Sequence, residues 1–94
     1  MKEKQVRTHV IVRGRVQGVC FRAETQKAAQ YYGVTGWVRN RKDGTVEAVF
    51  EGNENSVVSM LEWCRKGPPR SLVEKTDVTW ENYTGEFSQF RIAW

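Results

Sequence analysis

The sequence predicts a two-layer α/β (α+β) sandwich of the ferredoxin-like type, with two helices on one face of an antiparallel sheet. Along the 94 residues, the spacing of apolar residues changes twice from the period of two typical of a strand to the period typical of a helix, and back again. The resulting order is strand, helix, strand, strand, helix, strand, which two right-handed β-α-β units satisfy, plus a short C-terminal strand. No repeat or linker interrupts this order, so residues 1–94 are expected to form one domain.

The first strand is predicted over residues 5–13. Its side chains alternate, and the face that points inward holds Val6, Thr8, Val10 and Val12. Two glycines within residues 14–18 then interrupt the alternation. Gly33 is a favourable stop for a helix that begins near Phe21, and the apolar side of this helix holds Phe21, Thr25, Ala28, Ala29 and Tyr32.

The remaining elements follow the same logic. Further strands are predicted over residues 35–41, 45–51, 73–82 and 87–94. The tight turn Lys42-Asp43-Gly44 joins the first two of them into a hairpin. Asn53 is a favourable N-cap for the second helix, and Gly67-Pro68-Pro69 ends it. The apolar stripe of that helix consists of Val57, Met60, Leu61 and Cys64.

Composition limits the class of protein. With 39% hydrophobic residues the chain can bury one core, and its four tryptophans are expected in that core or at its edge. No apolar run approaches the roughly 18 residues of a membrane span, and the polar N-terminus is not a secretory signal, so a cytoplasmic protein is expected. A small domain with one compact core is expected to be a monomer. Cys20 and Cys64 fall in different elements and outside any metal-binding pattern, which predicts free thiols, no metal site and no cofactor. The net charge of +4 favours anionic partners without naming them.

Residues 14–22, Gly-Arg-Val-Gln-Gly-Val-Cys-Phe-Arg, carry the chemical signal. They join a strand to a helix N-terminus, where backbone N–H groups lack helical partners. Two glycines let the loop curl so that these N–H groups form an anion nest at the positive end of the helix dipole. Arg22, in the first helical turn, can offer a planar fork of donors to phosphate oxygens. The loop alone is equally compatible with an ordinary glycine turn followed by a surface arginine.

Asn40 favours the phosphate-site interpretation. The first two strands run in the same direction in this topology, so their C-terminal ends share one edge of the sheet, and Asn40 can face the loop. Its amide offers a donor and an acceptor, which suits the fixing of one water molecule for attack. Without the loop opposite, an asparagine before a turn would be read as turn chemistry.

These motifs resemble those of the acylphosphatase family. The similarity covers essentially the whole chain and lies in residues 14–22, Gly36-Trp37-Val38-Arg39-Asn40, Gly44-Thr45-Val46, Gly52 and Gly67-Pro68-Pro69. The C-terminal residues 90–94 depart from the family's common Ile-Arg-Tyr ending. The resemblance implies that Arg22 binds the substrate phosphate and that Asn40 orients the attacking water. It also implies that a phosphate cradle is formed by the backbone amides of Gln17, Gly18, Val19, Cys20 and Phe21.

The implied reaction suits a site with so few groups. An acyl phosphate releases a carboxylate whose conjugate acid has a pKa of about 4 to 5, so no general acid is needed. Charge neutralisation and an aligned water then suffice, without a metal ion. Cys20 is not a tyrosine-phosphatase nucleophile, because the Cys-x5-Arg spacing would place arginine where Gln26 stands. His9 lies mid-strand, away from the loop, and is expected to be structural.

The alternative is a non-catalytic anion- or nucleic-acid-binding module of the same fold. RNA-recognition domains share this element order but carry exposed aromatic residues on the third strand. Residues 45–51 contain one aromatic residue and two glutamates, so nucleic acid is not the expected partner. A membrane is not expected either, since no apolar run is long enough to span one. An acylphosphatase-like domain of a larger hydrogenase-maturation protein is a second alternative. Since one domain accounts for the whole sequence, a free-standing enzyme acting on a small acyl phosphate is preferred.

Overall fold

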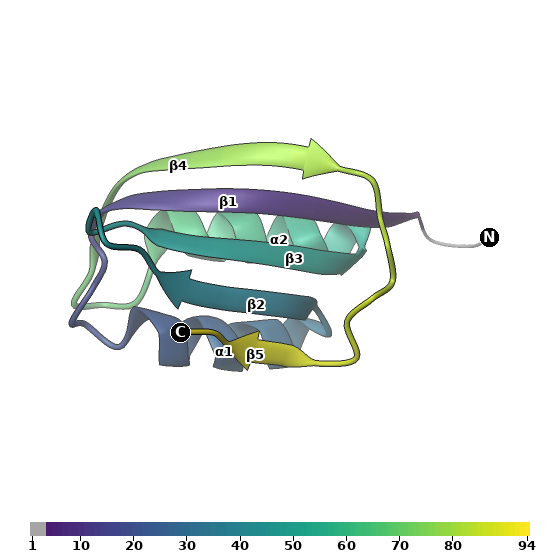
Figure 1. Cartoon of the computed structure of the whole chain (residues 1–94), viewed down its shortest axis with the longest axis horizontal. Helices are drawn as coiled ribbons and strands as arrows, with labels where there is room; N and C mark the ends of the chain where they lie inside the picture. Colours follow the sequence, from purple (N-terminus) through teal and green to yellow (C-terminus); the bar gives the residue numbers. More distant parts are fainter. Residues whose placement is uncertain (1–3) are drawn as a thin grey trace.

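The computed structural model describes residues 4–94 as a five-stranded sheet with two helices. The strands are β1 (Gln5–Arg15), β2 (Thr35–Asn40), β3 (Val46–Asn53), β4 (Leu72–Glu81) and β5 (Phe90–Ile92). The helices are α1 (Phe21–Tyr32) and α2 (Glu54–Lys66). The strand order across the sheet is β4-β1-β3-β2-β5, and both helices lie on the same face (Figure 1). The predicted element order and ferredoxin-like architecture are confirmed.

The antiparallel pairing predicted for the first four strands is confirmed, and the additional C-terminal strand makes the sheet mixed. β1 pairs antiparallel with β3 and with β4, and β2 pairs antiparallel with β3. β5 pairs parallel with β2, from Gly36 opposite Phe90 to Val38 opposite Ile92. The chain leaves β4 and crosses the end of the sheet along residues 82–89 to the opposite edge (Figure 1). A strand that starts at that end must run opposite to β4, and therefore in the same direction as β2.

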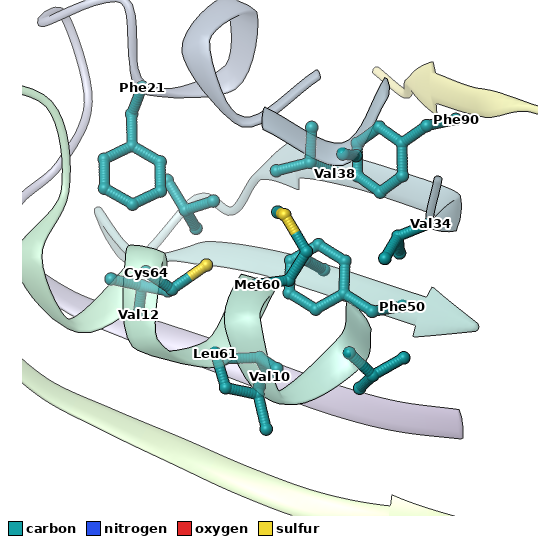
Figure 2. Packing of buried hydrophobic residues seen from close by; sticks show 14 of the residues in the cluster. Val10, Val12, Phe21, Val34, Val38, Phe50, Met60, Leu61, Cys64 and Phe90 are labelled. Atoms are coloured by element: carbon teal, nitrogen blue, oxygen red, sulfur yellow. The ribbon is translucent and has the colours of Figure 1, made fainter. Parts of the chain in front are cut away.

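The core lies between the sheet and the helices. All four residues predicted to point inward from the first strand are buried, as are Val46, Ala48 and Phe50 of β3. Figure 2 shows Met60 of α2 close to Phe50, whose ring stacks on that of Phe90 with 5.7 Å between centroids. Burial of each such side chain contributes about 1.5–3 kcal/mol. The contact between Phe50 and Phe90 thereby attaches the short β5 to the core.

The predicted helix ends are confirmed. The side chain of Asn53 accepts a hydrogen bond from the backbone N–H of Ser56 at 2.9 Å, as an N-cap does. Gly33 ends α1 with a φ of 73°, and α2 ends at Lys66, directly before the Gly-Pro-Pro segment. Neither helix within residues 4–94 has the length and apolar character needed to cross a membrane.

Two of the four tryptophans contradict the expectation of a core position. Trp80 is 52% exposed and Trp94 is 92% exposed, whereas Trp37 and Trp63 are partly buried. Trp80 lies on the edge strand β4 and Trp94 at the chain end, where no neighbouring element covers them. Cys20 and Cys64 are both free thiols, as predicted, and burial raises the pKa of Cys64 to about 12.

The crossover segment, residues 82–89, is held to the sheet by the carboxylate of Glu51, which is 1% exposed. It accepts hydrogen bonds from the backbone N–H groups of Thr84 and Gly85, from the Thr84 hydroxyl and from the Arg7 guanidinium. The same arginine also pairs with Glu81 and Glu86. The spacing of residues in the sequence does not predict these hydrogen bonds, because their donors lie more than thirty residues away from Glu51 along the chain.

Candidate active site

The connection between β1 and α1 presents unpartnered backbone N–H groups. Gly18 and Cys20 have φ angles of 73° and 62°, so the chain is left-handed at both positions and curls before the helix begins. The first helical hydrogen bond runs from the N–H of Glu24 to the carbonyl of Cys20 at 3.0 Å. Within residues 4–94, the N–H groups of residues 17–23 donate no hydrogen bond. These donors therefore remain available to an anion at the positive end of α1.

A cavity of about 470 Å³ lies beside this loop at the end of the sheet. It brings together Arg22, Asn40 and three of the predicted loop positions, Gly18, Cys20 and Phe21. The remaining lining residues are Val16, Ala23, Ile92 and Trp94. The two other predicted loop positions do not line it, because Val19 packs against the core and the side chain of Gln17 bonds to the hairpin.

Arg22 reaches the cavity with its hydrogen-bond donors unengaged. No carboxylate of residues 4–94 pairs with it, and it donates no side-chain hydrogen bond within that range. Its guanidinium carbon lies 4.6 Å from the ring centroid of Trp94, a cation–π contact. Figure 1 shows the C-terminus beside the start of α1, consistent with this contact. An anion would therefore meet a guanidinium whose charge no neighbouring carboxylate neutralises.

Asn40 lies at the last position of β2, opposite Val46 of β3. Its Oδ1 atom is buried and has no hydrogen-bond partner within the described residues. An unpaired buried acceptor costs about 1–3 kcal/mol, and a bound water molecule is a common way to satisfy one. Asn40 and Arg22 line the same cavity, and the unpaired acceptor of the Asn40 amide is the kind of group that a bound water molecule satisfies.

The side chain of Gln17 joins the loop to the hairpin that carries Asn40. Its Nε2 atom donates to the carbonyl oxygens of Arg41 at 2.7 Å and Thr45 at 2.8 Å. No sequence pattern predicted this bridge, because a glutamine in a glycine turn has no preferred partner. The expectation that the C-terminal ends of the first two strands share one edge of the sheet was the only indication that Gln17 could reach the hairpin.

His9 lies outside the cavity, as predicted. Its Nε2 atom is 2.6 Å from a carboxylate oxygen of Glu47, whose other oxygen accepts from Arg39 at 2.6 Å. Burial raises the pKa of Glu47, but the hydrogen bonds from His9 and Arg39 outweigh it and the net shift is downward. No group of three or more histidine, cysteine, aspartate or glutamate side chains among residues 4–94 is arranged to hold a metal ion.

The sequence model of the Acylphosphatase family matches residues 8–92. The chain belongs to the acylphosphatase family. An acylphosphatase from Pelotomaculum thermopropionicum is 55% identical over 89 residues, which are 95% of this chain and 97% of that relative. The crystal structure of acylphosphatase from Bacillus subtilis superimposes with a TM-score of 0.91 at 39% identity, over 95% of this chain and 99% of that one. The expected acylphosphatase function, that of a hydrolase, is thereby confirmed.

A similar fold also occurs within a much longer protein. HypF from T. kodakarensis is 27% identical, with a TM-score of 0.81, and the match covers 94% of this chain but only 12% of that one. The acylphosphatase fold thus occurs both in chains of this size and as a small part of a larger chain.

Two lining residues from outside the predicted loop and helix start, both near the C-terminus, were not expected from the sequence. Ile92 and Trp94 belong to the C-terminal segment, which departs from the usual ending of acylphosphatases. This unusual ending was the one feature of the sequence that could have drawn attention to the two residues. Its relevance to the site became visible only when β5 was placed beside β2, which brings the chain end to Arg22.

Proposed function

We propose that Arg22, the loop amides and Asn40 together hydrolyse the carboxyl–phosphate bond of a small acyl phosphate, by direct attack of water and without a metal ion. One observation carries the proposal. The Arg22 guanidinium, with unengaged donors, lines the same cavity as Asn40, whose side-chain oxygen is buried and has no partner within the described residues. The loop beside them has N–H groups that donate no hydrogen bond within those residues. These are the groups needed to hold a phosphate and to align a water molecule.

In this proposal the phosphoryl group lies in the loop between residues 17 and 21. The loop N–H groups and the fork of Arg22 bind its peripheral oxygens and neutralise the charge that they carry in the transition state. The left-handed backbone at Gly18 and Cys20 supports a cradle that is already curved before the substrate arrives. Arg22 and these amides therefore act on both substrate binding and turnover.

The Asn40 side chain accepts a hydrogen bond from the attacking water. This contact orients the water so that the water oxygen faces phosphorus. The water oxygen forms a bond to phosphorus while the bond from phosphorus to the acyl oxygen breaks and its electron pair leaves with the carboxylate. The amide is too weak a base to take the water proton. A non-bridging oxygen of the phosphate receives it, which yields inorganic phosphate and a carboxylate. The leaving group needs no protonation, because its conjugate acid has a pKa of about 4 to 5.

The test is the hydrolysis of benzoyl phosphate in the presence of EDTA. We expect the wild type to be active, and Arg22→Ala to lose both affinity for inorganic phosphate and turnover. Asn40→Ala should bind phosphate almost normally but lose about 10²–10³ in kcat, as when one positioned donor or acceptor is removed. Arg22→Lys keeps the charge without the planar fork, and we expect it to restore only part of the activity.

Three outcomes would count against the proposal. Full activity of Asn40→Ala would refute the positioning of water by this residue. Normal phosphate affinity of Arg22→Ala would show that Arg22 does not bind the phosphate. Activity that disappears in EDTA and returns with a divalent ion would refute the metal-free route.

Residues 1–94 are further proposed to act as one monomeric domain in the cytoplasm, on a small molecule and without nucleic acid. Both side chains proposed for the reaction come from one copy of the chain, which supports action as a monomer. The buried thiol of Cys64 and the exposed thiol of Cys20 suit a reducing compartment. Light scattering coupled to size-exclusion chromatography, with and without an RNA oligonucleotide, would test the oligomeric state and the absence of nucleic-acid binding.

A further inference from the structure

We propose that Gln17 is a positioning residue for the reaction, whose side-chain amide sets the separation between the phosphate loop and Asn40. This inference rests on the proposed role of Asn40. It assigns to the side chain of Gln17 a task distinct from that of the backbone amide at the same position.

Both N–H groups of the Gln17 amide are used. Its Nε2 atom lies 2.7 Å from the carbonyl oxygen of Arg41 and 2.8 Å from that of Thr45. Both distances are at the short end for N–H···O hydrogen bonds. One side chain thus bridges the two sides of the hairpin turn.

The turn that receives these bonds is itself well fixed. The carbonyl of Thr45 also accepts from the N–H of Arg41 at 2.9 Å, and the carbonyl of Arg41 accepts from the N–H of Gly44 at 3.2 Å. The carboxylate of Asp43 accepts from both the N–H and the hydroxyl of Thr45. These hydrogen bonds lower the pKa of Asp43, so it remains ionised near neutral pH. Gln17 therefore ties the loop to a turn that holds its own shape.

No other hydrogen bond within the described residues joins the loop, residues 16–20, to residues 40–45. The pairing of β1 with β3 ends where Val12 lies opposite Val46, and beyond this point β1 pairs only with β4. The loop and the end of β2 would otherwise be connected only through packing. Asn40 directly precedes Arg41, so a shift of the turn relative to the loop moves the Asn40 amide relative to the phosphate cradle.

Loss of the bridge should affect turnover more than phosphate binding. The cradle amides and Arg22 belong to the loop and to α1, and within the described residues none of these donors bonds to the hairpin. The alignment of the water depends on both sides of the cavity. A misplacement of about 1 Å can cost up to 10²-fold in rate. We therefore expect Gln17→Ala to lower kcat by about 10- to 100-fold, while the inhibition constant of inorganic phosphate changes by less than about threefold.

The experiment measures kcat with benzoyl phosphate and the inhibition constant of inorganic phosphate for Gln17→Ala and Gln17→Glu. The glutamate has a similar size but faces the two carbonyl oxygens without a donor, so it should impair kcat at least as much as alanine. Gln26→Ala is the matched control, because Gln26 also donates to a backbone carbonyl, that of Phe90 at 3.2 Å, but lies outside the cavity. It should keep wild-type kcat. Urea unfolding of each variant confirms that the folded protein is compared.

A double-mutant cycle separates positioning from a general structural effect. If Gln17 acts through Asn40, the change Gln17→Ala made in Asn40→Ala should lower kcat by less than about twofold further. Independent, multiplicative losses would overturn the inference, as would equal losses of phosphate affinity and kcat. If Asn40→Ala is impaired while Gln17→Ala matches the wild type, only this inference fails. If Asn40→Ala is fully active, the proposed function fails first.

Discussion

Replacing Glu51 with glutamine should loosen the crossover segment, residues 82–89, without disturbing the cavity. Glu51 lies on β3 opposite Thr35, at the end of the β2–β3 ladder away from the pair of Asn40 and Val46. One carboxylate oxygen accepts from the N–H and hydroxyl of Thr84, both at 2.9 Å, and from Arg7 at 3.2 Å. The other accepts from the N–H of Gly85 at 3.1 Å. The substitution changes charge and hydrogen bonding but hardly the volume.

The size of the effect follows from these contacts. The glutamine oxygen can replace the carboxylate oxygen that accepts three bonds, which leaves the new NH2 group facing the N–H of Gly85. One lost acceptor and one buried donor without a partner cost about 1–3 kcal/mol. The bonds from Thr84 and Arg7 also weaken, because hydrogen bonds to a charged group contribute about 1.5–3 kcal/mol and those to a neutral group about 0.5–1.5 kcal/mol. We expect a total destabilisation of about 2–4 kcal/mol.

Urea unfolding followed by tryptophan fluorescence measures this loss. With an m-value of about 1–3 kcal/mol/M, the midpoint should fall by about 1 M or more. The matched control is Glu86→Gln, which also removes a carboxylate from Arg7 but at a site that is 55% exposed. That change should cost less than about 1 kcal/mol. A Glu51→Gln protein as stable as the wild type would refute the anchoring of the crossover, and a reduced kcat of its folded form would refute the separation from the cavity.

The difference in stability between wild type and Glu51→Gln should also depend on pH, and its direction follows from the pKa of Glu51. Burial alone would raise the pKa of Glu51, but the donors from Thr84, Arg7 and Gly85 outweigh it, so the pKa is lowered. A lowered pKa in the folded state stabilises the protein fully above the unfolded value of about 4.3, and this contribution is lost as the pH falls through the folded value. The difference in unfolding midpoint between wild type and Glu51→Gln should be largest near neutral pH and shrink below about pH 4.

Two further predictions concern the C-terminus and the thiols. Trp94→Ala removes the ring whose centroid lies 4.6 Å from the guanidinium carbon of Arg22. An exposed cation–π contact contributes about 0.5–1 kcal/mol, so KM for benzoyl phosphate should rise about two- to fivefold. Trp80→Ala, at the far edge of the sheet, should leave KM unchanged, and equal effects of the two changes would contradict a local role. Iodoacetamide should modify only Cys20 in the folded protein, because burial raises the pKa of Cys64 to about 12; mass spectrometry should find one adduct, and two in urea. A second adduct under native conditions would contradict the burial of Cys64.

The order of elements and their approximate ends could be predicted from the sequence because they depend on local properties. The alternation along β1, the helical spacing from Phe21 and the stop at Gly33 are each determined by a few neighbouring residues. Arg22 could be placed at a helix start for the same reason. The position of Asn40 required one further step, the common direction of the first two strands, which follows from the topology.

Contacts between segments that lie far apart in the chain could not be predicted in this way. The parallel pairing of β5, the anchoring of residues 82–89 by Glu51, and the ring of Trp94 beside Arg22 each join positions separated by dozens of residues. The resemblance to acylphosphatases did not supply them either, since the C-terminal segment departs from the family's usual ending.

By itself, then, the sequence determined the succession of strands and helices, the glycine-containing loop and the two residues proposed for the reaction. Local backbone preferences and the periodicity of apolar side chains are sufficient for these features. The tertiary structure decided which groups surround Arg22 and Asn40, and how the loop and hairpin are held at a given separation. That separation depends on the side chain of Gln17 meeting two carbonyl groups more than twenty residues away, and such a contact exists only after the sheet has formed.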